Sequence, residues 1–208
     1  MGFLRYIADN RSLMPAPAQP DLEANRVYRT KEFARWGKNP ARLVHRLVEE
    51  GQLLELAHGL YYAPAKSRFG TVAPRDDELL RAFLETDEYV LTGPPAWTTL
   101  GLGATAMFAA TLVYNRKRTG AFELGGRKFL LRRVAFPPRP PREWFAVDLI
   151  AHQAMAGVGP DALAAGLPRE IREGRLKPIV LLEMAAAYGT KATSALVRES
   201  IRRAEEVA

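Results

Sequence analysis

Glycine, proline and asparagine divide residues 26–64 into short elements of fixed order, and no other part of the chain restricts the fold as strongly. Thr30 is a suitable N-cap for a short helix, which Gly37 ends. A second helix is predicted from Asn39-Pro40 to Gly51, because asparagine caps well and proline at the first helical position gives up no hydrogen bond. Two short helices joined by a tight turn containing glycine predict a helix-turn-helix.

The second predicted helix has an apolar face and a basic face. At about 100° per residue, its apolar and basic side chains fall on opposite sides. The apolar residues are Leu43, Val44, Leu47 and Val48, and the basic residues are Arg42, His45 and Arg46. A recognition helix needs this arrangement, because the apolar face holds it on its domain while arginine and histidine reach into a major groove. A solvated amphipathic helix without a ligand would show the same pattern.

The residues after this helix predict a short β-hairpin. Two β-prone runs, at residues 52–56 and 60–62, flank a turn at Ala57-His58-Gly59. Helix, turn, helix and hairpin in this order form the winged-helix plan, and each element agrees with the others. We therefore expect a winged helix-turn-helix DNA-binding domain over residues 1–68.

Positive charge is concentrated in two stretches. The chain has 30 Lys and Arg against 23 Asp and Glu, a net charge of +7. Residues 26–68 hold nine cations against four acids, and residues 115–142 hold nine against one. Such clusters predict surfaces that meet phosphate, whereas scattered cations would serve solubility alone. Arg116, Lys117 and Arg118 are predicted at a hairpin tip, where they would bind DNA backbone, an acidic protein face, or nothing.

The rest of the chain predicts an α+β domain over residues 69–208, after a hinge at about 66–75. The expected order is a helix at 76–85, a strand and short helix over 89–102, an antiparallel meander between 109 and 135, a polyproline-like spacer at 136–141, and helices from Glu143 to Val207. The fold class is thus α+β: an N-terminal winged helix, then a small antiparallel sheet with C-terminal helices. A short amphipathic helix carrying Phe3, Leu4 and Ile7 is expected at the N-terminus.

The amino-acid composition argues against several kinds of functional site. The chain has no cysteine and only three histidines, far apart, which predicts no disulfide, no metal site and no thiol nucleophile. Asp148 and His152 share a helix face, where an acid–base pair is one interpretation and a structural hydrogen bond the preferred one. No phosphate-binding glycine motif occurs. We expect no enzyme activity, no cofactor, no membrane contact and a cytoplasmic location.

The motifs of both halves resemble one family. The first helix (TKEFARWG), the second helix ending in RLVEEGQL and the wing ending in HGLYY are similar to the N-terminal domain of AbiEi-type antitoxins of type IV toxin–antitoxin pairs. In the second half, YVLTGPPAWTTLGL is similar to the family's strand, which ends in Ser-Gly and leads into a helix ending in Gly-Leu. The specific resemblance covers about residues 26–64 and 89–102.

The resemblance implies repression of the protein's own operon and neutralisation of a nucleotidyltransferase-like toxin. By position it implies double-stranded DNA contacts from the second helix, the first helix and the wing: Arg42, His45 and Arg46; Arg29, Thr30 and Lys31; and His58. The sequence departs from the family at Ala57-His58, where an arginine often precedes the wing glycine, and at Pro95-Ala96-Trp97, in place of a Ser-Ala-Leu-like start. The first departure predicts a weaker wing contact.

A protein-interaction module is the alternative function. In that case the winged helix is a docking scaffold without sequence-specific DNA binding, and the C-terminal helices carry the partner surface. The salt dependence of binding distinguishes the two functions, because affinity for DNA falls steeply as salt concentration rises, in proportion to the number of phosphates contacted.

Overall fold

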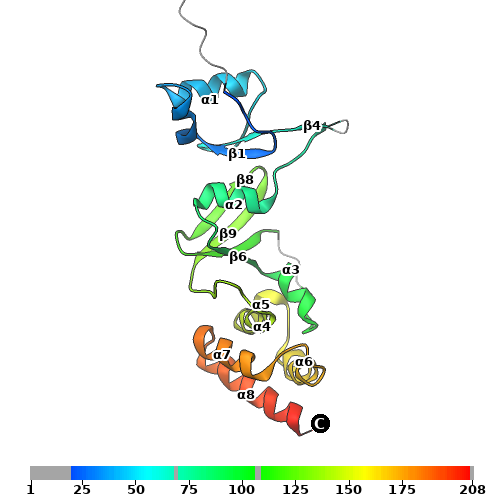
Figure 1. Cartoon of the computed structure of the whole chain (residues 1–208). Helices are drawn as coiled ribbons and strands as arrows, with labels where there is room; N and C mark the ends of the chain where they lie inside the picture. Colours follow the sequence, from blue (N-terminus) through cyan, green and yellow to red (C-terminus); the bar gives the residue numbers. More distant parts are fainter. Residues whose placement is uncertain (1–19, 68–69, 106–108, 207–208) are drawn as a thin grey trace, which may run out of the picture. The chain divides into compact units, whose positions relative to one another are not determined.

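The computed structural model describes residues 20–67, 70–105 and 109–206, and the chain divides into two compact units, Met1–Phe83 and Leu84–Ala208 (Figure 1). The predicted boundary, between residues 68 and 69, lies earlier than this division. Helix α2 (Asp76–Leu84) accounts for the difference, since all but its last residue groups with the first unit. The predicted N-terminal amphipathic helix lies outside the described residues.

The first unit follows the winged-helix order. Its elements are β1 (Arg26–Arg29), the 3-10 helix η1 (Thr30–Arg35), α1 (Pro40–Glu49), β2 (Leu54–Ala57) and β3 (Leu60–Ala63). The strands form an antiparallel sheet of order β1-β3-β2. A two-stranded ribbon, β4 (Lys66–Ser67) with β5 (Gly70–Thr71), follows at the predicted hinge. The predicted second helix and the hairpin are confirmed.

The start of the first helix differs from the prediction that Thr30 caps it. Residues 26–29 are a strand, and the cap position belongs to Arg29, whose backbone is extended (φ −102°, ψ 151°). The Arg29 amide donates to Glu32 Oε1 at 2.8 Å, as the acidic member of a capping box does. Thr30 is instead the first residue of η1, and its amide donates to the Gly59 carbonyl at 3.1 Å.

Aromatic residues hold η1 and α1 on the sheet. Tyr28, Phe33 and Trp36 form a cluster with ring centroids 5.4–6.3 Å apart. Val44 and Leu47 of α1 belong to the same core, and each is 1% exposed. The apolar face predicted for this helix therefore packs inward, which fixes the direction of its basic face.

The second unit combines a four-stranded sheet with C-terminal helices, which confirms the α+β class. Its strands are β6 (Tyr89–Thr92), β7 (Thr111–Asn115), β8 (Gly120–Leu124) and β9 (Arg127–Arg133). Its helices are α3 (Pro94–Trp97), the 3-10 helix η2 (Thr98–Leu100), α4 (Arg142–Ala151), α5 (Gln153–Ala156), α6 (Pro160–Arg172), α7 (Pro178–Tyr188) and α8 (Lys191–Glu205). Within the helical layer α4 packs on α7, and α6 and α7 pack on α8 (Figure 1).

The predicted antiparallel meander is wrong. The sheet has the order β6-β7-β9-β8, and β7 pairs with β9 in parallel, so β8 lies at the edge. Phe129, Leu130 and Leu131 give β9 the apolar faces that a central strand needs, whereas β8 exposes Ala121 and Glu123. The basic turn at residues 116–119 is therefore a crossover between strands that are not neighbours, and not a hairpin tip.

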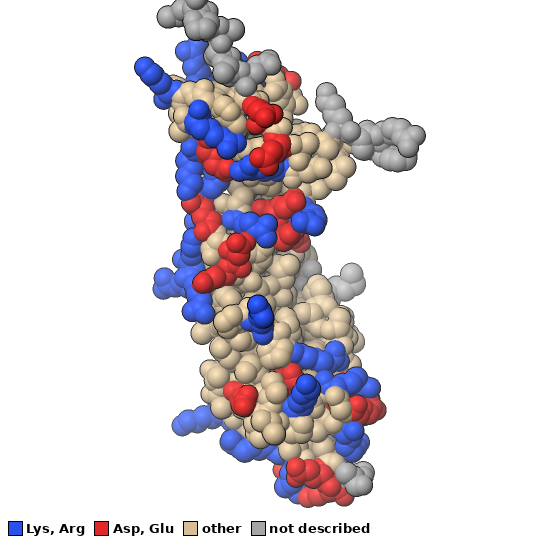
Figure 2. All heavy atoms as spheres, viewed as in Figure 1, with Lys and Arg blue, Asp and Glu red and all other residues tan. Residues whose placement is uncertain are grey.

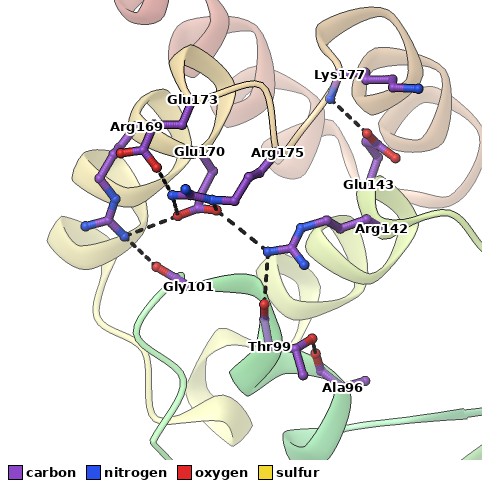
Figure 3. A network of polar contacts seen from close by, with 10 residues as sticks. All are labelled: Ala96, Thr99, Gly101, Arg142, Glu143, Arg169, Glu170, Glu173, Arg175 and Lys177. Atoms are coloured by element: carbon purple, nitrogen blue, oxygen red, sulfur yellow. Dashed lines mark hydrogen bonds and ion pairs between the residues drawn. The ribbon is translucent and has the colours of Figure 1, made fainter.

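A buried carboxylate joins η2 to the helical layer (Figure 3). The Glu170 side chain is 1% exposed and accepts two hydrogen bonds from the Arg175 guanidinium, at 2.6 and 2.8 Å. Arg169 donates both to Glu170 at 3.3 Å and to the Gly101 carbonyl at 2.7 Å. Arg142 donates to the Thr99 carbonyl at 2.9 Å, and the same nitrogen lies 3.7 Å from Glu170. These bonds fix the end of η2, the Gly-Leu position of the sequence motif, against α4 and α6.

Candidate nucleic-acid interface

Helix α1 presents its basic face to solvent. Arg42 and His45 are exposed, and Arg46 is half-buried, with its Nε 3.7 Å from Glu50 Oε1. Asn39 caps the helix by accepting the Arg42 amide at 3.1 Å on its side-chain oxygen. The cap, the inward apolar face and the outward arginine and histidine together give a recognition-helix geometry.

A depression of about 370 Å³ lies beside the start of α1, at the turn between the two helices. Trp36, Leu43, Arg42 and Arg46 line it, together with Gly37 and Asn39. The Arg35 guanidinium lies 3.7 Å from the centre of the Trp36 ring, a cation–π contact that holds this exposed arginine at the rim. Neither Arg35 nor Trp36 is among the site residues predicted from sequence. The available signal was a tryptophan next to an arginine within the turn motif.

The three residues expected to contact phosphate from the first helix have different surroundings. Lys31 is exposed. Thr30 is half-buried beside the wing turn, where its amide is bonded to Gly59. The Arg29 guanidinium is half-buried and donates to the carbonyls of Ala82 and Phe83, each at 3.3 Å. It therefore neutralises the carboxyl end of α2, where the helix carbonyls lack partners and the dipole is negative.

The wing carries an exposed histidine. His58 lies in the turn between β2 and β3, and Gly59 has the left-handed φ (+76°) that such a turn requires. The hairpin register shifts between Glu55 and Ala57, which indicates a bulge next to the turn. His58 is the basic side chain that this turn exposes.

A buried asparagine shapes the basic turn of the second unit. The Asn115 side-chain oxygen accepts the amides of Lys117 and Arg118, both at 2.8 Å, and its amide nitrogen donates to the Arg118 carbonyl at 2.9 Å. Arg116 lies 5.3 Å from the Phe136 ring centre and 3.5 Å from Glu88, and Lys117 Nζ donates to the Glu85 carbonyl at 2.8 Å. The turn is therefore ordered, and its cations are partly engaged within the second unit.

Acidic residues interrupt the basic surface. Figure 2 shows Lys and Arg side chains on both units, interspersed with Asp and Glu. In the first unit, for example, Arg26 is paired with Glu23 at 2.6 Å and with Glu32 at 3.0 Å. The candidate interface is thus defined by individual exposed basic side chains on α1, η1 and the wing, and not by a continuous field of one sign.

The predicted contact between Asp148 and His152 is present, within a larger buried network. Asp148 Oδ2 accepts Thr92 Oγ1 at 2.6 Å and Trp97 Nε1 at 3.0 Å, and its Oδ1 accepts the Tyr114 hydroxyl at 2.8 Å. His152 Nδ1 lies 3.2 Å from the same Oδ1. Burial and the adjacent Asp148 carboxylate raise the pKa of the Tyr114 hydroxyl. Trp97 and Trp144, predicted as core or interface anchors, are 0% and 2% exposed.

Comparisons with known proteins establish the fold alone. No protein-family model and no curated protein matches the chain. The crystal structure of the RV2827C protein from Mycobacterium tuberculosis is similar, with a TM-score of 0.52 at 14% sequence identity, over 84% of this chain and 72% of that one. None of the helices in the described ranges is both long and apolar enough to cross a bilayer.

Proposed function

We propose that the protein is a DNA-binding transcriptional repressor that regulates its own operon and serves as the antitoxin of a type IV toxin–antitoxin pair, as its resemblance to AbiEi-type antitoxins implies. The observation that carries the DNA-binding part is the orientation of α1. Arg42 and His45 are exposed, while Val44 and Leu47 on the opposite face are each 1% exposed. A helix held in this way in a winged-helix unit can place its basic face in a major groove.

The contacts divide into two kinds. We assign Arg42, His45 and Arg46 to base edges, because they lie on the exposed side of α1, and Lys31 and His58 to phosphates beside the groove. The Thr30 hydroxyl can donate a hydrogen bond to the phosphate backbone of the DNA. Arg29 we assign to holding α2, because its guanidinium is bonded to Ala82 and Phe83.

Binding to the DNA upstream of the protein's own gene tests the assignment. Arg42→Ala should weaken specific binding by about 1–3 kcal/mol and relax sequence preference, whereas Lys31→Ala should weaken binding to all sequences alike. Arg198→Ala on α8 is the matched control, because it removes an exposed arginine from the second unit. Fluorescence anisotropy on the upstream duplex and a scrambled duplex separates these outcomes. Equal losses for Arg42→Ala and Arg198→Ala would contradict the proposal.

An exposed apolar face on α7 favours a protein partner. Ile179 is 73% exposed and Leu182 is 38% exposed, and Ala186 lies exposed one helical turn further on. The helix sequence PIVLLEMAAAY contains one charged residue, so it is apolar on nearly all sides, as in helices covered on more than one side. This surface suits the toxin, and it equally suits the alternative function of an interaction module without sequence-specific DNA binding.

Co-purification with the toxin encoded beside the gene tests this surface. Ile179→Ser with Leu182→Ser should reduce recovery of the toxin and leave affinity for the upstream duplex unchanged. Val72→Ser is the control, because Val72 is an exposed apolar residue of the first unit, at 48%. Loss of toxin recovery in a protein that shows no preference for its upstream DNA would favour the interaction module.

A further inference from the structure

A small pocket in the second unit gathers polar groups that neither DNA binding nor the α7 face uses. It measures about 150 Å³ and is lined by Tyr114, Arg132, Asp148 and His152, with Trp144 and Tyr188 among its walls. Tyr114 and Arg132 are register partners near the carboxyl ends of the parallel strands β7 and β9. Ligands of open α/β sheets bind outside the carboxyl ends of parallel strands, where side chains from neighbouring strands converge.

The contact with Arg132 selects one tautomer for the neutral form of His152. Arg132 Nη1 lies 3.3 Å from His152 Nε2, and a guanidinium can only donate, so Nε2 is the acceptor. Nδ1 therefore carries the hydrogen and donates to the Asp148 backbone carbonyl at 2.9 Å. The Trp97 ring stacks on the imidazole with centroids 5.9 Å apart. In its neutral form, His152 thus presents a basic nitrogen to the pocket, next to the Arg132 guanidinium.

Arg132 brings a guanidinium to this pocket, where it contacts His152 and not a carboxylate. Its guanidinium forms no ion pair with any Asp or Glu of the described ranges. Asp148 is already occupied by the hydroxyls of Thr92 and Tyr114 and by the Trp97 indole. A guanidinium with spare donors at a pocket is suited to an oxyanion, which it binds through two parallel hydrogen bonds.

The volume of the pocket and the charges in its lining determine which oxyanion it can bind. A pocket of about 150 Å³ has room for roughly five waters, taking about 30 Å³ for each, which fits a group of a few heavy atoms. The Asp148 carboxylate in the pocket lining opposes a doubly charged phosphate more strongly than a single negative charge. A carboxylate has the planar shape and single charge that these neighbours accept.

The geometry points to a carboxylate-binding pocket, in which Arg132 and His152 hold the two oxygens of a free small carboxylate or of an acidic side chain from a partner protein. The incoming group replaces the bond between Arg132 and His152 with one bond to each. Trp144 and Tyr188 contact its short apolar stem.

Binding in this pocket takes up a proton. His152 must be protonated at Nε2 to donate to the ligand. The charged and titratable groups that face it are Asp148 on α4, Arg132 on β9, Tyr114 on β7 and Tyr188 on α7. The hydrogen bond to Asp148 raises the pKa of His152, while Arg132 opposes this. A bound carboxylate removes that opposition, so affinity should increase as pH falls through the pKa of His152.

Titration of the full-length protein with acetate, inorganic phosphate, and a capped Gly-Glu-Gly peptide beside its Gly-Gln-Gly counterpart tests the proposal. We expect saturable NMR shifts of His152 and the Trp144 indole with acetate or the Glu peptide, and an affinity that increases several-fold between pH 8 and pH 6. Acetate binding would identify a free small carboxylate as sufficient, and binding of the Glu peptide alone would identify an acidic side chain. Phosphate binding tighter than that of every carboxylate, or no saturation by any probe, would overturn the proposal.

A pair of neighbouring arginines provides the matched variants. Arg132→Gln should weaken the binding at least tenfold, and Arg133→Gln, at the exposed next position of β9, should leave it unchanged. Equal effects of the two substitutions would overturn the assignment. If Arg132→Gln does not fold, as judged by its melting curve, the comparison of the Glu and Gln peptides and the pH dependence of the wild-type protein decide instead.

Discussion

Glu170 leaves no room for a side chain at Gly101. Gly101 has φ +73°, and a Cβ at this position would lie 2.7 Å from Glu170 Oε1. Arg175 and Arg169 hold that carboxylate, so it cannot move away without breaking charge-assisted hydrogen bonds. The glycine of the Gly-Leu motif therefore reflects a packing requirement of a buried ion pair.

Gly101→Ala should destabilise the protein more than Gly174→Ala. Both glycines have a left-handed φ, +73° and +71°, but a Cβ at Gly174 would meet nothing within 4 Å. The shared backbone strain costs about 1–2 kcal/mol, and displacement of Glu170 adds about 1–3 kcal/mol at Gly101 alone. Urea unfolding of the two variants measures the difference. Equal free energies of unfolding for the two variants would show that the Glu170 side chain can move aside without loss of stability.

The Glu170 network should also make stability depend on pH. The hydrogen bonds from Arg175 lower the pKa of the Glu170 carboxyl below its ordinary value of 4.5. The stabilisation is complete above that value and is lost as pH falls through the lowered pKa of the folded state. The difference in unfolding free energy between wild type and Glu170→Gln should therefore shrink below about pH 4.5. Glu123→Gln, which removes an exposed carboxylate of β8 outside this network, is the matched control.

Buried polar residues are hard to identify from sequence because their hydrogen-bond partners are distant along the chain. Asn115 binds the turn that follows it, which a sequence can suggest, but it also donates to the Arg132 carbonyl across the parallel pair at 3.4 Å. Asp148 collects donors from β6, α3 and β7. The i,i+4 spacing reveals His152 as a partner and gives no indication of Thr92, Trp97 or Tyr114.

The N-cap of α1 is the local signal on which the proposed recognition helix depends. Asn39 Oδ1 accepts the Arg42 amide, and Pro40 follows at the first helical position. The two residues explain why the helix 39–50 could be predicted from sequence: the cap, the proline and the terminal glycine are all short-range signals. The wing is equally local, since a glycine turn fixes it.

Asn39→Ala should lower the free energy of unfolding by about 1 kcal/mol, the usual cost of removing a cap. Asn39→Ser should restore most of it, because a serine hydroxyl can accept the same amide. Urea unfolding, followed through the transition of the first unit, measures both. A serine variant as unstable as the alanine variant would show that the cap is not the source of the effect.

The strand order of the second unit could not be predicted because pairing is a long-range property. Turn signals after β7 and β8 suggest neighbours in sequence order, yet β9 lies between these strands. Inserting β9 buries Phe129 and Leu131, at 1% and 0% exposure, and leaves the more polar β8 at the edge. The strand that buries more apolar area takes the central position of the sheet, and the turn residues do not reveal which strand that is.

The chain contains two units, and its basic residues are distributed over both. The sequence predicts two units and their fold class but places the boundary before α2, because the proline and glycine at residues 70–74 suggest a hinge. The bonds from Arg29 to the end of α2 could not be inferred from that composition.

The basic turn of the second unit should contribute to DNA affinity through phosphates. Replacing Arg116, Lys117 and Arg118 with serine should reduce the slope of log affinity against log salt by up to about 0.9 for each phosphate that is no longer bound, with sequence preference unchanged. Arg172→Ser with Arg198→Ser, at exposed sites on α6 and α8, should leave the slope unchanged. An unchanged slope together with a failure to neutralise the toxin would assign the turn to the protein partner.

We propose that α1 recognises a DNA sequence, and equilibrium DNA binding of the double variant Arg42→Ala, Arg46→Ala tests this role of the helix. Wild-type protein should prefer the duplex upstream of its own gene over a scrambled duplex of the same length at the same salt concentration. The double variant should lose that preference while retaining the weak, salt-dependent binding that phosphate contacts provide. Equal affinity of the wild type and the double variant for the upstream duplex would contradict the claim.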